Sequence, residues 1–138
     1  MEENLTRREV REGAFIVLYQ TLFGVDVKEV CEANEEAFGL VKNEETDEIV
    51  NGVLAHSEEL EQIIAKYSTT RYVSRIAKVN MVIMKIAVYE MKYCERVPNA
   101  AAINEAVELS KKYAYKADSG FINGVLNAYL GELDGAEK

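Results

Sequence analysis

Near the start of the chain, arginine and aromatic residues are spaced so that together they could contact a phosphate backbone and an unpaired base. Arg8 and Tyr19 are eleven residues apart, about three helical turns, so they share one face of a helix. Arg11 and Phe15 lie between them on or near that face, and Arg7 precedes them. Guanidinium groups bind phosphate, and a neighbouring ring can stack on a base. The alternative from the residues alone is a solvated arginine face with Tyr19 half in the core.

A second candidate contact lies near the C-terminus. Phe121 follows a polar turn at the expected start of a helix, where an aromatic ring can stay partly exposed. Together with Asp118 and Ser119 it could touch a base. Gly124 in the same helix lowers helix propensity, and the usual compensation is a close contact between helices. We therefore expect Gly124 to be structural.

Catalytic motifs are absent from the sequence. There is no GxxxxGK[ST] loop for phosphates, no GxGxxG turn for a dinucleotide and no cysteine–histidine cluster for zinc. Serine, cysteine and histidine occur in no arrangement that suggests a nucleophile with its base. His56 is the only histidine, and a lone histidine is far more often a surface residue than a ligand. The sequence predicts a binding protein with no metal and no cofactor, not an enzyme.

The charge is unevenly distributed along the chain. The net charge is −8, and residues 26–61 carry twelve acidic residues against two lysines. Residues 71–92 instead carry five basic residues and one glutamate. A basic surface can exist on such a protein because charges are screened over about 8–10 Å in physiological salt. The acidic segment itself is best interpreted as a solvated face.

Length and composition favour one globular domain. At 138 residues, with 49% hydrophobic and 29% charged residues, the chain can bury a real core. We expect a single domain over residues 1–138, with a folded core over about residues 5–131 and a short acidic tail. No apolar run is long enough to span a membrane, and the N-terminus lacks a signal-peptide core. Two distant cysteines favour a cytoplasmic setting.

The elements that must position these residues are all helical. The apolar residues follow a 3.6-residue period throughout, and no strand is required. Thr6 and Glu9 predict a capping box for a first helix that runs to about Phe23, with Gly24 as its left-handed stop. Asp26 predicts the cap of a second helix over Val27 to Phe38.

Later helices follow the same signals. A third helix is expected from Thr46 or Asp47 to Tyr67, with Leu54 among its core positions. Residues 68–79 predict a turn with one or two turns of helix, and Asn80 predicts the cap of the next helix. Two helices then fill residues 97–130, the second capped by Asp118 or Ser119. The fold class is therefore an all-α bundle of about six or seven helices.

Four segments resemble, in order, the signature of the NusB family of bacterial transcription antitermination factors. They are the arginine-rich opening at residues 7–20, Ile86–Glu90, Ile103–Leu109 and Ser119–Leu126. The resemblance implies two packed three-helix units. It also implies a protein that pairs with NusE, a small-subunit ribosomal protein, to bind single-stranded boxA RNA. The complex joins RNA polymerase and suppresses termination, notably in ribosomal RNA operons. The RNA-binding residues that the resemblance implies are Arg7, Arg8, Arg11, Tyr19, Asp118 and Phe121.

Other interpretations remain open beside this resemblance. The chain could be a homodimeric helical protein without a direct RNA role, since some NusB proteins dimerise through the surface that would meet RNA. It could also be a stand-alone relative of the RNA-binding domain of RNA cytosine methyltransferases. Four positions depart from the usual family residues, namely Asn80, Lys85, Gly120 and Asn127. The missing basic residue at Gly120 puts an RNA contact there in doubt. The NusE-facing residues are placed only loosely, around residues 80–105.

Overall fold

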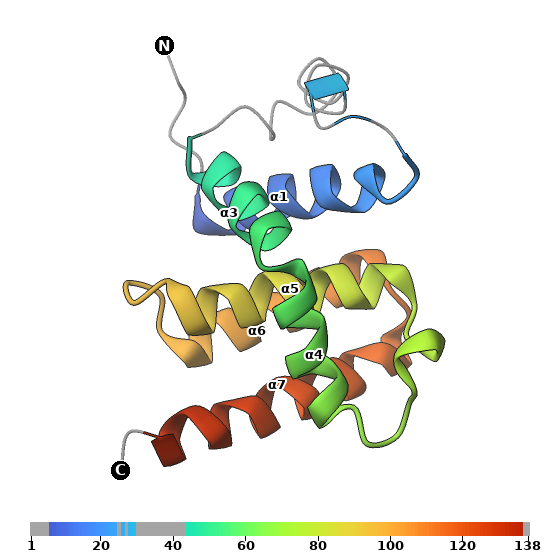
Figure 1. Ribbon diagram of the computed structural model, residues 1–138, viewed down its shortest axis with the longest axis vertical. Helices are drawn as coiled ribbons and strands as arrows, with labels where there is room; N and C mark the ends of the chain where they lie inside the picture. Colours follow the sequence, from blue (N-terminus) through green and yellow to red (C-terminus); the bar gives the residue numbers. More distant parts are fainter. Residues whose placement is uncertain (1–5, 25, 27, 30–43, 137–138) are drawn as a thin grey trace. The chain divides into compact units, whose positions relative to one another are not determined.

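The computed structural model describes residues 6–24, 26, 28–29 and 44–136, and its described elements are all helices (Figure 1). The chain divides into two compact units, residues 1–55 and residues 56–138. No strand occurs among the described residues, so the all-α prediction is confirmed. The assignment of residues 1–138 to a single domain stays a prediction.

The first unit is built on α1 (Arg7–Thr21), which packs against α3 (Glu44–Ala55). The predicted capping box is present, because the Thr6 hydroxyl accepts the Glu9 N–H at 3.1 Å and the Glu9 carboxylate accepts the Thr6 N–H at 3.0 Å. Gly24 follows α1 with a φ of 83°, in the left-handed region expected of a helix stop. Both ends of the first helix were therefore predictable from residue type.

The second predicted helix, Val27 to Phe38, lies almost entirely outside the described residues. What is described at its start agrees with its expected cap. The Asp26 carboxylate accepts the backbone N–H of Lys28 at 3.2 Å, as a capping side chain does.

The prediction of one continuous helix from Thr46 to Tyr67 was wrong. α3 ends at Ala55, His56 has φ −111° and ψ 14°, and α4 (Ser57–Tyr67) begins after it. Ser57 is followed by Glu58 and Glu59, and acidic residues in a first turn stabilise a helix N-terminus. Leu54 was also misplaced, because it is 45% exposed.

The second unit holds four α-helices and a 3₁₀ helix among the described residues. Their bounds are α4 (Ser57–Tyr67), η1 (Val73–Arg75), α5 (Lys78–Tyr93), α6 (Asn99–Tyr113) and α7 (Lys116–Ala136). α5 contacts the other three α-helices, and α7 also packs against α4 and α6. The largest fully buried side chains of this core include Leu60, Ile64, Ile83, Ile86, Ile122, Leu126 and Tyr129. The turn with a short helix predicted over residues 68–79 is confirmed.

Two predicted caps in this unit were wrong. Asn80 lies inside α5, and the cap position of that helix is Ala77. The Asn80 side chain is fully buried, and neither of its amide atoms forms a hydrogen bond of normal geometry. α7 begins at Lys116, so Asp118 lies in its first turn and is not its cap. An acidic residue in the first turn is favourable there as well, which is why the pattern suggests either position.

Candidate nucleic-acid interface

The first two arginines of α1 are on the surface of the first unit. Arg7 and Arg8 are both exposed. The Arg7 guanidinium donates to the Glu45 carboxylate at 2.8 Å, which joins the start of α1 to the start of α3. Exposed ion pairs contribute little, so a phosphate can compete for Arg7 at a small cost.

Arg11 differs from the two arginines before it, because only 6% of its surface is exposed. Helical spacing predicted that Arg11 lies on or near the same face as Arg8. Spacing within one helix cannot show whether a neighbouring element covers that face. Direct RNA contact by Arg11 stays a prediction. In this structure Arg7 and Arg8 are the exposed arginines of α1.

Tyr19 is the middle ring of an aromatic row along α1. Its ring stacks on Phe15, with centroids 5.7 Å apart and planes 11° apart, and meets Phe23 edge-on at 5.3 Å. Phe15 is buried, Tyr19 is half-buried and Phe23 is 61% exposed. The sequence interpretation missed Phe23, although the i, i+4, i+8 spacing of the three rings signals it. Such a row ends in an exposed ring, Phe23, on which an unpaired base can stack.

In the second unit, Arg71 brings Asp118 and Phe121 together. The Arg71 guanidinium donates to the Asp118 carboxylate at 3.0 Å and lies 4.2 Å from the centroid of the Phe121 ring. Partial burial raises the pKa of Asp118, but the bond from Arg71, the nearby Asn80 amide and the Arg71 charge together lower it below its ordinary value. Asp118 is therefore an anion at neutral pH. The sequence signal for Arg71 was only its place in a basic segment.

A pocket of about 470 Å³ lies beside this group. Its lining residues are Tyr67, Thr69, Thr70, Arg71, Gly120, Phe121, Gly124, Val125 and Ala128. A methyl group placed on Gly124 or Gly120 would meet nothing within 4 Å. The expected close helix contact at Gly124 is therefore wrong, and the glycine instead leaves room in the pocket wall. Ser119 faces α6, where its hydroxyl lies 2.7 Å from that of Ser110.

His56 is part of a polar and aromatic cluster in the second unit. Its ring stacks on Tyr93 with centroids 4.3 Å apart, and its Nδ1 lies 3.7 Å from the Glu59 carboxylate. No group of three or more potential metal ligands occurs among the described residues.

None of the helices in the described ranges has the length and apolarity to cross a membrane.

The predicted site residues thus form two sets. Arg7, Arg8, Arg11 and Tyr19 belong to α1 of the first unit, and Asp118 and Phe121 belong to α7 of the second. The first set combines cationic groups with an aromatic ring, and in the second set Arg71 adds a cation to the ring of Phe121 and the carboxylate of Asp118. Both could hold a phosphate and a base, and neither contains the paired groups that acid–base catalysis needs.

Comparisons with known proteins decide the family. The model described as the NusB family matches residues 8–130. The transcription antitermination protein NusB of Bacillus subtilis is 34% identical over 134 residues, which cover 94% of this chain and 98% of the relative. The chain belongs to the NusB family.

Solved structures agree with this membership. The solution structure of NusB from Aquifex aeolicus has a TM-score of 0.76 and 27% identity, over 96% of this chain and 94% of that one. A chain in the crystal structure of antitermination factors NusB and NusE in complex with double-stranded RNA has a TM-score of 0.76 and 28% identity. That match covers 88% of this chain and 93% of the other. The all-α fold is therefore the NusB fold, as the sequence resemblance implied.

NusB membership makes this chain a transcription antitermination protein and not an enzyme. That agrees with the binding protein predicted from the missing catalytic motifs. The B. subtilis relative is matched over nearly its whole length, so the likeness extends to an entire antitermination factor.

Proposed function

We propose that this NusB protein pairs with the ribosomal protein NusE in the cytoplasm and that the pair binds single-stranded boxA RNA. Bound to RNA polymerase, the complex would suppress termination, notably in ribosomal RNA operons. The observation that carries the proposal is that α1 presents two exposed arginines and an aromatic row, on a chain with a net charge of −8. The similarity to a chain in a NusB–NusE–RNA complex supports the same partners.

Charge explains why a partner is required. Most affinity for nucleic acid comes from neutralised phosphates, and a strongly acidic protein has little general attraction for them. Its binding must rest on local groups such as Arg7 and Arg8, on rings such as Tyr19 and Phe121, and on a second protein that extends the surface. Asp118 would act by holding Arg71 beside Phe121 and by accepting hydrogen bonds from a base.

The test is an equilibrium binding measurement with three protein samples. A labelled boxA RNA and a scrambled RNA of equal length are titrated with this chain, with NusE and with an equimolar mixture. The proposal expects the mixture to bind boxA RNA more tightly than either protein does, and more tightly than it binds the scrambled RNA. Equal affinity of the mixture and NusE alone would contradict it.

A homodimer is the second candidate, and one observation favours it. Leu22 and Phe23, at the end of α1, are 48% and 61% exposed, and exposed apolar pairs often mark an interface. Sedimentation equilibrium of the chain alone decides this candidate. If the dimer persists when NusE and boxA RNA are present, the surface of α1 would be assigned to self-association and not to RNA binding.

A further inference from the structure

Two connecting segments meet at one end of the second unit. The connection between α4 and α5 contains Arg71, and the turn between α6 and α7 leads into Asp118 and Phe121. The Arg71 guanidinium joins the two segments through its 3.0 Å bond to Asp118 and its place over the Phe121 ring. Figure 1 shows both segments at the same end of this unit. The residues that flank Arg71 and Asp118 therefore lie at this end of the unit.

Each segment presents a tyrosine that is almost completely exposed. Tyr72 directly follows Arg71 and exposes 84% of its surface, and Tyr115 exposes 83%. The backbone carbonyl of Tyr115 accepts the Asp118 N–H at 2.9 Å, which fixes the turn beside the Arg71–Asp118 pair. Tyrosines usually bury most of their ring, so two exposed rings on adjoining segments are not accounted for by packing.

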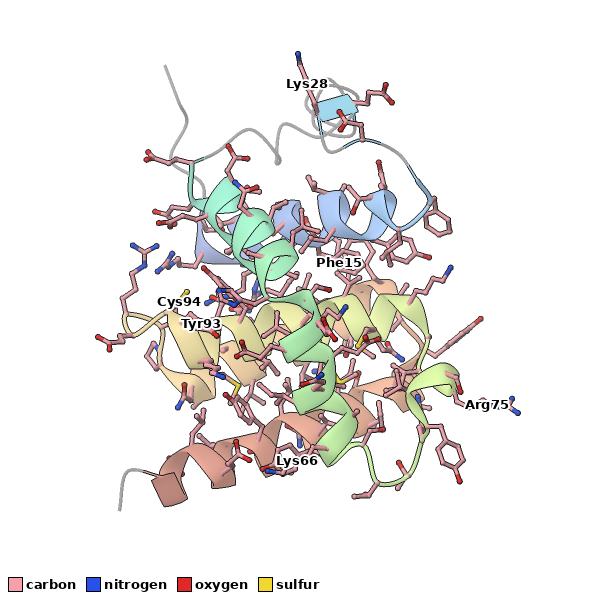
Figure 2. All side chains as sticks on the ribbon, in the orientation of Figure 1. Phe15, Lys28, Lys66, Arg75, Tyr93 and Cys94 are labelled. Carbon is pink, nitrogen blue, oxygen red and sulfur yellow. The ribbon has the colours of Figure 1, made fainter. Side chains whose placement is uncertain are left out.

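Each segment also presents a cation without a counter-charge. Arg75 and Lys116 are exposed, and neither forms an ion pair with any residue that the structure describes. Figure 2 shows Arg75 pointing away from the ribbon. Other exposed cations, such as Arg7 and Lys66, are paired with carboxylates.

We propose that Tyr72, Arg75, Tyr115 and Lys116 form a second binding surface for single-stranded RNA, continuous with the Arg71–Phe121 group. Cations that follow a phosphate backbone, interleaved with rings on which bases stack, are the combination that binds single strands with little sequence preference. An acidic protein partner could pair with the cations, but binding to it would not require two exposed aromatic rings. The inference rests on the proposed function and adds residues that hold RNA beyond the boxA contacts.

Three variants of the full chain test this surface. Tyr72→Ala with Tyr115→Ala removes both rings, and Arg75→Gln with Lys116→Gln removes both cations. All four side chains are exposed, so the fold should tolerate the changes. The matched control is Lys28→Gln with Lys66→Gln, which removes two exposed cations elsewhere. Affinity is measured for boxA RNA with NusE present, and for a scrambled single strand at low salt with NusE absent.

The expected results separate the rings from the cations. Losing both rings should weaken binding of both RNAs at least about fivefold, since one stacked base contributes about 1–3 kcal/mol. Losing both cations should lower the log–log salt slope by up to about 1.4, or about 0.7 for each phosphate contact to a single strand. The control should leave affinity and slope close to those of the unaltered chain.

Each other outcome has one interpretation. If the unaltered chain binds boxA RNA with NusE and the variants bind equally well, this surface is excluded and the proposed function stands. If boxA RNA is not preferred but the variants lose affinity for the scrambled strand, the surface stands and the proposed function is wrong. If polyglutamate competes as strongly as RNA and the ring variant changes nothing, the surface binds acidic polypeptide and the RNA assignment is wrong.

Discussion

At the scale of single residues, substitutions of Tyr19 distinguish the contribution of base stacking to RNA affinity from the contribution of charge. Tyr19→Ala should weaken binding of boxA RNA to the NusE-paired protein by about 1–3 kcal/mol with a nearly unchanged salt slope, because a ring contributes stacking and no charge. Tyr19→Phe keeps the ring and should bind almost normally. Because Tyr19 also stacks on Phe15, melting temperatures must be compared. An alanine variant that melts early but binds at full affinity would assign Tyr19 to the core.

Asp118 gives a prediction about pH. Its folded pKa lies below the ordinary value, so its carboxylate stabilises the fold above the unfolded pKa. That contribution is lost as pH falls from about 4 through the folded pKa. The free energy of unfolding of the unaltered chain should therefore decrease more steeply below about pH 4 than that of Asp118→Asn. Urea unfolding at several pH values measures the difference, and parallel curves would show that the Arg71–Asp118 pair adds no stability.

Residue types predicted the exposure of candidate site residues only where local spacing was sufficient. Helical spacing placed Arg8 and Tyr19 on one face, and the structure gives them an exposed and a half-buried environment. The same spacing could not show that Arg11 is buried, because burial depends on packing between elements. Nor could it show that Arg71, 47 positions before Asp118, would bridge Asp118 and Phe121.

At the scale of elements, the capping box of α1 gives a prediction about the stability of the protein. Thr6→Ala removes the hydroxyl that accepts the Glu9 N–H and should destabilise the protein by about 1 kcal/mol. Thr21→Ala is the matched control, because the Thr21 hydroxyl only donates to the Leu18 carbonyl within the helix. Thermal unfolding followed by circular dichroism compares the two. Equal melting temperatures would mean that the N-terminus of α1 is frayed in solution.

Helix positions were easier to predict than helix boundaries. Apolar periodicity correctly indicated helices and excluded strands among the described residues, because one buried face is enough to impose the period. The break at His56 was missed because periodicity continues across it, while the only start signal was Ser57 followed by acids. Asn80 was misread as a cap because asparagine favours caps, whereas its fully buried position inside α5 depends on tertiary packing.

At the scale of the whole molecule, the proposed function requires an acidic chain to bind an acidic polymer. A net charge of −8 opposes general RNA binding, so under the proposed function the affinity must come from a few exposed cations and rings and from the partner protein. Family membership follows from similarity over most of the chain, and no single motif would have been sufficient. The contribution of α1 to RNA binding is the central claim that similarity does not provide.

The salt dependence of boxA RNA binding tests that claim most directly. Affinity of the NusE-paired complex is measured across a salt series for the unaltered chain, for Arg7→Gln with Arg8→Gln, and for the control Lys28→Gln with Lys66→Gln. Because Arg7 and Arg8 are exposed, the arginine variant should fold normally, and its log–log slope should fall by up to about 1.4 if both contact phosphate. The control should keep the original slope. An arginine variant with unaltered affinity and slope would contradict this claim, because it would show that the exposed arginines of α1 do not contact the RNA.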